Sequence, residues 1–249
     1  MGTIQLTIKR WAAWMPGITT RQDWQDWQAG VKSPLVGESP AVQEIPPLLR
    51  RRLSPMGKMA LSVAWPLLRE NGALPSLFCS RHGELERTVA MLKDLARGHE
   101  LSPTRFSLSV HNAIGGIWSI ARGDTSPVSA LALGNEDLSM ALLETRLILA
   151  EQRVSEALCV IYDAPLPADY AEFDCGPGLP YAAAFIVTTS SSDGIPLSLR
   201  MCGAEEVVAP APPTENSQEP QTLRFLRYLL TESPDPLLLS ARRDYWQWS

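Results

Sequence analysis

Segments with the character of strands alternate with segments of helical periodicity along most of this chain. The predicted strands lie within residues 3–13, 76–80, 128–133, 158–163, 181–189 and 196–201. The predicted helices cover residues 23–28, 55–67, 84–96, 110–121, 136–152 and 223–230. This alternation is typical of an α/β layered fold. Three strands follow one another between residues 158 and 201 without a helix, which predicts a mixed rather than a purely parallel sheet.

Two helices carry further local signals. Ser54 is a natural N-cap, and Pro55 occupies the first helical position after it. In the helix at 84–96, apolar residues recur on one side and predict an amphipathic element. In the helix at 110–121, Gly115 and Gly116 interrupt an apolar run, which indicates close packing against another backbone.

The charge balance excludes some function classes. The chain has 249 residues, a formal net charge of −5 and a sequence pI of about 5.3. An acidic chain is a poor candidate for non-specific binding to nucleic acid or to an anionic membrane. The short basic run at residues 50–52 has the character of a solvated face. We therefore expect no nucleic-acid partner, and the absence of a long apolar stretch predicts no membrane insertion.

The cysteines give no metal or disulfide signature. Cys79, Cys159, Cys175 and Cys202 are widely spaced and form neither a CxxC pair nor a zinc pattern. Cys79 and Cys159 stand in apolar runs and are typical of small buried hydrophobic residues. No signal-peptide pattern precedes the first strand, so we expect a cytoplasmic protein without a cofactor.

Composition divides the chain into three parts. We expect residues 1–203 to form one domain and residues 204–222 to form a Pro- and Ala-rich acidic linker. Residues 223–249 then comprise a short helix and an aromatic, basic tail. Tryptophans at 24, 27, 246 and 248 flank the chain ends, and such residues either anchor a partner or fold back onto their own domain.

Several ordered segments together resemble the N-terminal half of β-ketoacyl synthases. These are Lys58 to Leu61, Cys79 to Glu84, the stretch SLSVHNA with the following GG and SI at residues 107–120, and a strand, a turn at Gly134-Asn135 and a long helix. More narrowly, the chain is similar to the short ketosynthase-like subunits of aryl polyene and related type II polyketide or fatty-acid systems. The resemblance covers residues 4–190 and implies a truncated thiolase-like fold, with layered helices around a mixed β-sheet.

The resemblance also implies catalytic groups that this chain lacks. Ketosynthases of this type carry a cysteine thiolate at the tip of a strand–turn–helix, where the helix N-terminus lowers the thiol pKa. The matching position falls on Gly134, and no cysteine lies between Cys79 and Cys159. Glu136 and Asp137 follow in the first helical turn, where carboxylates would raise a thiol pKa. The family's two catalytic histidines belong to the later half, whereas this chain has no histidine after His111.

These absences predict a subunit with no catalytic residues of its own. The resemblance implies a chain-length factor that forms a heterodimer with a catalytic ketosynthase subunit, completes its acyl tunnel and influences product length. An acyl carrier protein would then bind mainly through the catalytic partner. The apolar, uncharged strand at 128–133 would be an aggregation risk as an exposed sheet edge, and a partner covering it would remove that risk.

The resemblance places one helix near the dimer interface and the acyl tunnel. We expect the following residues to contribute there: His111, Asn112, Ile114, Ile117, Trp118, Gly134 and Asn135. Trp118 is large enough to form the floor of a tunnel. The competing interpretation is that His111 and Asn112 cap a helix and that the apolar residues belong to the core.

A second hypothesis comes from a different class. Cys79 and His82 would form the nucleophile and base of a small cysteine-dependent acyltransferase or hydrolase. They stand three residues apart across a strand-to-helix turn, and the sequence identifies neither an orienting carboxylate nor an oxyanion hole for them. A buried cysteine and a histidine at a helix start explain the same residues without chemistry.

Overall fold

The computed structural model describes residues 3–68, 72–174, 178–190, 194–203, 219–231, 235–241 and 244–249, except for the Asn135 side chain. The strands are β1 (Ile4–Trp14), β2 (Ser76–Cys79), β3 (Val128–Leu131), β4 (Glu156–Asp163), β5 (Tyr181–Thr188), β6 (Ile195–Gly203), β7 (Leu237–Ser240) and β8 (Asp244–Trp248). The helices are α1 (Arg21–Gln28), α2 (Pro47–Arg50), α3 (Pro55–Ala64), α4 (Leu85–Ala96), α5 (Pro103–Ser107), α6 (Ala113–Arg122), α7 (Asp137–Gln152) and α8 (Gln221–Thr231). Three short 3-10 helices are η1 (Trp65–Leu67), η2 (Gly134–Glu136) and η3 (Ala168–Phe173).

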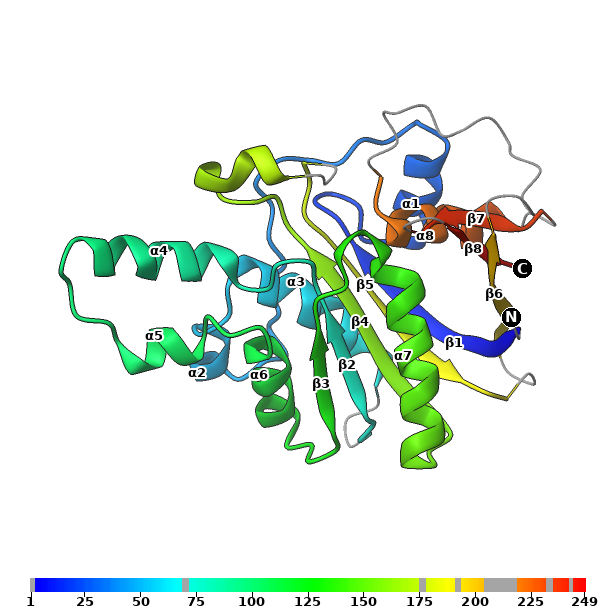
Figure 1. The fold of residues 1–249 in the computed structure, drawn as a ribbon, viewed down its shortest axis with the longest axis horizontal. Coiled ribbons are helices and arrows are strands. Elements are labelled where there is room, and N and C mark those ends of the chain that lie inside the picture. The colour runs from blue at the N-terminus through cyan, green and yellow to red at the C-terminus, as the bar shows by residue number, and fades with distance from the viewer. Residues whose placement is uncertain are drawn as a thin grey trace.

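One sheet organises the described residues, in the order β3-β2-β4-β5-β1-β6-β8-β7. Strand β2 pairs in parallel with β3 and β4, whereas every other neighbouring pair is antiparallel. The mixed sheet that the sequence predicts is therefore confirmed. The parallel part occupies one end of the sheet and leaves β3 as its outer strand (Figure 1).

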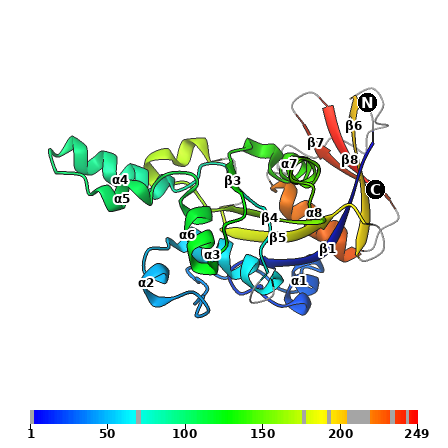
Figure 2. The same ribbon diagram turned by 90° about the horizontal axis from the view of Figure 1, so that it is seen from below.

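Two hydrophobic clusters cover the two faces of this sheet. Helices α3 and α6 lie on one face with Phe78, Val160 and Ile186. Helices α7 and α8 lie on the other face with Cys159 and Phe185. Figure 2 shows these two helical layers on opposite sides of the central strands. The central strands β4 and β5, which are buried apart from Glu156, supply side chains to both clusters, because successive side chains of a strand point to opposite faces.

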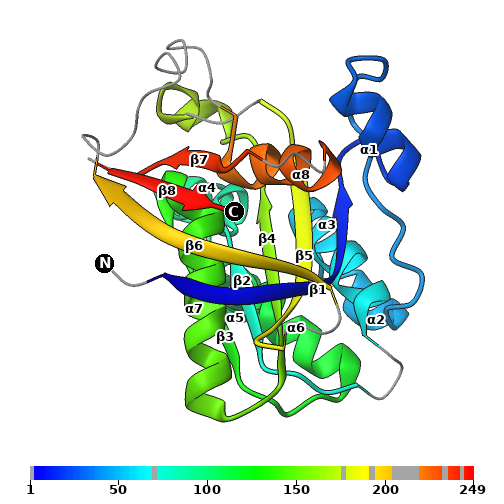
Figure 3. The same ribbon diagram turned by 90° about the vertical axis from the view of Figure 1, so that its right-hand side faces the viewer.

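The C-terminal helix and strands extend the layer around α7. Helix α8 lies beside α7, and β8 adds to the edge of β6, with β7 outside it (Figure 3). Trp246 and Trp248 are buried in the cluster around α7. At the other chain end, Trp24 is also buried there, and the Arg227 guanidinium of α8 lies 3.5 Å from the Trp27 ring. These tryptophans therefore pack against their own chain.

Local signals place most elements within a few residues of the expectation. The Ser54 hydroxyl accepts a hydrogen bond from the Gly57 N–H at 2.9 Å, and Pro55 begins α3 as predicted. Gly115 is needed for close packing, because a Cβ there would lie 2.7 Å from Val128 Cγ1. The sequence reading missed α2, α5, β7 and β8. Residues 204–218 of the predicted linker and Cys175 lie outside the described residues.

Helices α4 and α5 form an arm that extends from the body beyond α2 and α6 (Figure 1). The predicted amphipathic face of α4 is only partly buried. Val89 is 6% exposed, whereas Leu92 is 51% and Leu95 is 56% exposed. Phe106 of α5 is also exposed. The apolar side of this helix is therefore only partly covered by its own chain.

Strands β5 and β6 follow one another in the chain but lie on opposite edges of β1, so the connection between them crosses β1. At the crossing, Gly194 has a φ of +138° and lies directly against the backbone of β1. A Cβ at this position would lie 2.5 Å from Ile8 O and 2.8 Å from Lys9 Cα. Only glycine can adopt this positive φ and also lie this close to the backbone of β1 without moving the sheet.

Within the described residues, no helix has both the length and the apolar character needed to cross a bilayer.

We expect Gly194→Ala to lower the free energy of unfolding by at least about 2 kcal/mol, because a methyl group collides with backbone atoms and the φ value is strained for an L-residue. The matched control is Gly116→Ala, on an exposed site of α6 where a Cβ meets no atom within 4 Å. There alanine should stabilise the helix by up to about 1 kcal/mol. Urea unfolding of both variants measures the difference, and equal effects would contradict this account.

Candidate functional site

The strand–turn–helix that the sequence singles out consists of β3, the 3-10 turn η2 and helix α7. Gly134 begins η2 with a φ of +59° and is exposed. A Cβ at Gly134 would meet no other atom within 4 Å. The position at the tip of the turn is therefore open in space, but it carries no side chain that could act on a substrate.

The C-terminal segment caps the first turn of α7. The Ser139 N–H donates to Gln221 Oε1 of α8 at 3.2 Å, and Trp248 Nε1 of β8 donates to the Ser139 hydroxyl at 3.2 Å. Trp246 Nε1 donates to Glu136 Oε2 at 2.9 Å. Backbone N–H groups at a helix start lack helical partners and can otherwise bind an anion. Here side chains of the same chain engage this helix end.

Asp137 is the buried centre of this contact. Its Oδ2 accepts hydrogen bonds from Thr222 Oγ1 at 2.8 Å and from Tyr181 Oη at 3.0 Å. Its Oδ1 is buried without a hydrogen-bond partner among the described residues. Desolvation by burial raises the pKa of Asp137 to about 6, although the hydrogen bonds from Thr222, Leu138 and Tyr181 oppose the shift. Burial likewise raises the pKa of the Tyr181 phenol, so Tyr181 remains the donor.

A buried ion pair lies at the ends of the neighbouring strands. The Arg81 guanidinium follows β2 and forms a salt bridge with Asp163, the last residue of β4. Asp174 Oδ1 lies 3.7 Å from Arg81 Nη2. Desolvation raises the pKa of Asp163 and Arg81 opposes that shift. The sequence reading missed this pair, yet it contained a signal, because an arginine and an aspartate end two adjacent apolar strands.

His111 and Gly134 lie near the same end of β3. His111 Nε2 is 2.8 Å from Leu131 O, the carbonyl of the last residue of β3. The His111 ring also packs against Gly83, where a Cβ would lie 2.5 Å from His111 Nδ1. Asn112 is exposed at the start of α6 and makes no side-chain cap hydrogen bond.

The apolar members of the predicted set lie deeper, on the face of the sheet opposite α7. Ile114 and Ile117 are buried on α6, and Trp118 is fully buried. The Trp118 ring meets Trp65 edge-on at a centroid distance of 5.8 Å and lies 6.2 Å from Phe78. Within this chain alone, Trp118 is therefore a core residue that separates α6 from the sheet.

The alternative nucleophile and base are not brought together. Cys79 is 0% exposed within β2, and burial raises the pKa of its thiol well above the ordinary value. His82 is exposed. Cys159 is the second cysteine that stands in an apolar run, and burial raises the pKa of its thiol to about 12. Both thiols stay protonated and inaccessible, which argues against the cysteine-enzyme hypothesis. In the described part of the chain, no group of three or more His, Cys, Asp or Glu residues is arranged to hold a metal ion.

The raised pKa of Asp137 predicts a pH effect on stability. The folded state holds the Asp137 proton up to about pH 6, whereas the unfolded state loses it near its ordinary pKa of 3.8. The stabilising contribution is therefore complete below that lower value and is lost as pH rises through about 6. Asp137→Asn removes this titration, so the variant should gain up to about 3 kcal/mol relative to the wild type between pH 4 and pH 7.5.

Urea unfolding across this pH range measures the gain. The matched control is Asp169→Asn, because Lys93 holds the pKa of the half-exposed Asp169 carboxyl below its usual value. Removing the Asp169 carboxyl therefore changes the pH dependence in the opposite sense. A pH-independent difference between Asp137→Asn and the wild type would contradict burial of a protonated carboxyl.

Comparison with known protein families matches residues 24–249 to the family described as β-ketoacyl synthase, N-terminal domain. The match begins later than the resemblance seen in the sequence and continues through the C-terminal strands. Comparison with curated proteins finds no similar sequence.

Solved structures show the same fold. A chain of the ketosynthase (ApeO) in complex with its chain length factor (ApeC) from Xenorhabdus doucetiae is 27% identical, with a TM-score of 0.80 and coverage of 99% of both chains. The ishigamide ketosynthase/chain length factor is 15% identical, with a TM-score of 0.62, over 81% of this chain and 68% of that chain. Ketosynthase twelve of the bacillaene synthase from Bacillus amyloliquefaciens is 15% identical, with a TM-score of 0.54, over 82% and 46%.

The present chain thus spans about half the length of the bacillaene ketosynthase. The predicted thiolase-like, ketosynthase-type fold is confirmed, and the chain belongs to the β-ketoacyl synthase N-terminal domain family.

Proposed function

We propose that this chain is the non-catalytic chain-length-factor subunit of a β-ketoacyl synthase. It pairs with a catalytic ketosynthase subunit in the cytoplasm, completes the acyl tunnel of that subunit and influences product length in polyene, polyketide or fatty-acid-type biosynthesis. The observation that carries the proposal is the first turn of α7. The turn before it presents Gly134 in place of a nucleophile, and side chains of the C-terminal segment engage the helix end.

The electrostatics of this turn support a role without chemistry. A catalytic thiolate would need the positive end of the helix dipole and uncommitted N–H groups. Glu136 and Asp137 instead place two carboxyl groups at this end. Trp246 of β8 donates to Glu136, and Thr222 of α8 donates to Asp137. A thiol or oxyanion at Gly134 would gain little stabilisation from such a helix start.

Similarity to a complex of a ketosynthase with its chain length factor supports the partner role. One chain of that complex, from Xenorhabdus doucetiae, is 27% identical to this chain, with a TM-score of 0.80.

The outer edge of β3 supports pairing through the sheet. The Ser76 and Ser80 N–H groups of the β2 side donate to Pro127 O and Leu131 O. Because backbone groups alternate along a strand, those of Val128 and Ala130 point away from β2, toward the free edge. The arm of α4 and α5 exposes Leu92, Leu95 and Phe106 to solvent in this chain alone. A catalytic subunit that adds a strand to β3 would cover apolar surface of this kind.

The alternative, a small acyltransferase or hydrolase built on Cys79 and His82, has less support. Cys79 is fully buried with a raised thiol pKa, and His82 is exposed. Iodoacetamide labelling of the folded chain should therefore be slow at Cys79 across neutral pH, and rapid labelling with loss of an acyl-transfer activity would favour the alternative.

Co-expression with the ketosynthase encoded nearest to this chain should yield a one-to-one complex by size-exclusion chromatography with mass determination. Ala130→Pro removes an N–H that faces the free edge without touching the bonds to β2, so this variant should remain folded and lose the complex. Val31→Ala, at an exposed site in the loop after α1, is the control and should retain it. A wild-type chain that stays monomeric beside the ketosynthase would refute the partner role.

Product length tests the predicted tunnel residues. If α6 faces the shared acyl tunnel in the complex, Trp118→Phe enlarges that space while keeping an aromatic ring against Phe78. We expect the assembled enzyme to shift toward longer products by one or two elongation steps, measured by mass spectrometry of the released chains. Val31→Ala should leave the distribution unchanged. An unaltered distribution from a stable Trp118→Phe complex would assign Trp118 to the core alone.

A further inference from the structure

Part of β1 has an open edge on the side of this strand that faces away from β3 in the sheet order. Strand β1 pairs with β5 up to Trp14 but pairs with β6 only from Ile4 to Ile8. Among the described residues, the part of β1 from Arg10 to Trp14 therefore has a strand partner on one edge only. Unpaired backbone groups on such an edge are able to bind an added strand.

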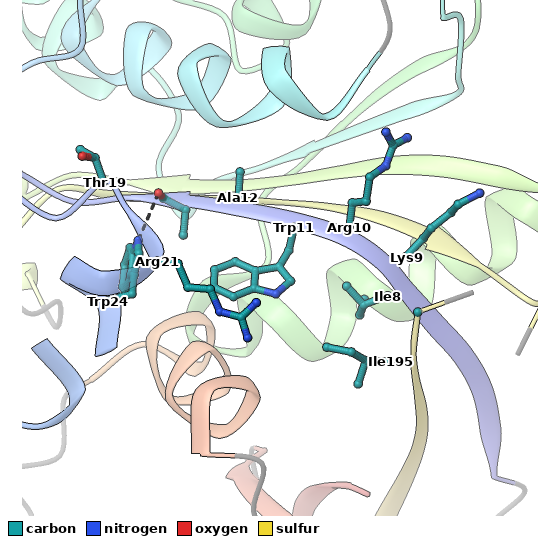
Figure 4. A pocket seen from close by; sticks show the side chains of 11 residues that line it. Ile8, Lys9, Arg10, Trp11, Ala12, Thr19, Arg21, Trp24 and Ile195 are labelled. Carbon is teal, nitrogen blue, oxygen red and sulfur yellow. Dashed lines mark hydrogen bonds between the residues drawn. The ribbon is translucent and has the colours of Figure 1, made fainter. Parts of the chain in front are cut away.

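A hollow of about 430 Å³ lies along this edge. Six consecutive residues of β1, from Ile8 to Ala13, line it. Gly194 and Ile195 close one end, where β6 leaves β1, and α1 closes the other with Arg21 and Trp24. Figure 4 shows the hollow from close by. A hollow that follows a strand edge matches an extended segment better than a compact ligand.

The backbone along the hollow is oriented for pairing. Trp24 Nε1 donates to Ala13 O at 3.3 Å, which is the dashed line in Figure 4. This bond shows that the backbone carbonyl of Ala13 faces the open edge of β1 and not β5. Because backbone groups alternate along a strand, the N–H and C=O of Trp11 face the same side. Trp24 thus caps one end of the edge, and the following groups toward Ile195 lie along the hollow.

Different side chains lie on the two faces of the β1 edge. Lys9 and Arg10 lie on one side of the β1 ribbon, and Trp11, Arg21 and Ile195 lie on the other (Figure 4). Ile195 is 39% exposed, and Trp11 is partly buried. An added strand directs successive side chains alternately toward these two faces.

The charges along the hollow favour acidic partners. The residues that line it include three cations and no carboxylate, although the chain as a whole carries a net charge of −5. Lys9 forms a salt bridge with Glu156 at 2.8 Å. Arg10 and Arg21 form no salt bridge with any residue that the structure describes. Two guanidinium groups flanking the edge attract and orient carboxylates.

We propose that the edge of β1 binds an extended acidic peptide segment of a partner protein by strand addition. A segment of about five residues, roughly 17 Å long, spans Lys9 to Ala13. Its backbone pairs with Trp11, its carboxylates approach Arg10 and Arg21, and an apolar side chain rests on Trp11 and Ile195. Charged residues on an edge also serve to discourage pairing, but a half-buried indole and an exposed isoleucine in the hollow give an incoming strand apolar contact.

The test uses the full chain and a fluorescein-labelled peptide of alternating glutamate and valine, measured by fluorescence anisotropy. Two further peptides carry N-methyl groups on the glutamates or on the valines. Only alternate residues of an added strand bond to β1, so one methylated peptide should bind at least tenfold more weakly and the other should bind like the parent peptide. An Arg10→Glu, Arg21→Glu double variant should lose at least tenfold in affinity. Arg51→Glu, an exposed cation after α2, is the matched control and should bind normally.

Four results would overturn the proposal. Equal binding of both methylated peptides would indicate attraction by charge without strand pairing. Displacement of the peptide by benzoate or inorganic phosphate at the same concentration would indicate a small-anion pocket. Self-association abolished by the double variant would assign the edge to a second copy of this chain. Absence of binding at millimolar peptide would show that the charges only protect the edge. None of these readouts involves β3, so the outcome is independent of pairing with a ketosynthase.

Discussion

Hydrogen bonds to the first turn of α7 determine the position of the C-terminal segment. Gln221 accepts from the Ser139 N–H, Thr222 donates to Asp137, and Trp248 donates to the Ser139 hydroxyl. These contacts hold the start of α8 and the end of β8 against one helix turn. Strand β8 can then pair with β6, and β7 with β8. The contacts that complete this fold therefore engage the first turn of α7, next to the exposed Gly134.

Buried carboxyl groups at the neighbouring strand ends add to the electrostatics of this turn. Asp163 is balanced by Arg81, whereas Asp137 forms no salt bridge with any residue that the structure describes and has a pKa of about 6. The field of Asp163 adds to the desolvation that raises the pKa of Asp137. A thiolate or an oxyanion at the exposed Gly134 would therefore form close to carboxyl groups whose field opposes a further negative charge.

The sequence predicts elements whose stability is local and misses those that depend on distant partners. The interiors of β4 and β5 are apolar, and α3 begins with a side-chain cap, so these elements could be recognised from adjacent residues. The strands β7 and β8 could not, because their short segments become strands only by pairing with each other and with β6. The turn at Gly134 follows from a strand, a glycine and a long helix. The contacts at the start of α7 do not, because Tyr181, Thr222 and Trp246 lie 44, 85 and 110 residues from their partners in the chain.

The free edges of β3 and β1 differ in the chemistry that surrounds them. The residues of β3 are apolar or small and uncharged, and the neighbouring arm exposes leucines and a phenylalanine. Such an edge is suited to a large and permanent interface, since its exposure in solution would promote aggregation. The edge of β1 is short and interrupted by the crossing at Gly194, and it is flanked by Arg10 and Arg21. A short cationic edge tolerates solvent between binding events, so it is suited to the proposed acidic segment, which would bind and dissociate without disturbing a partner at β3.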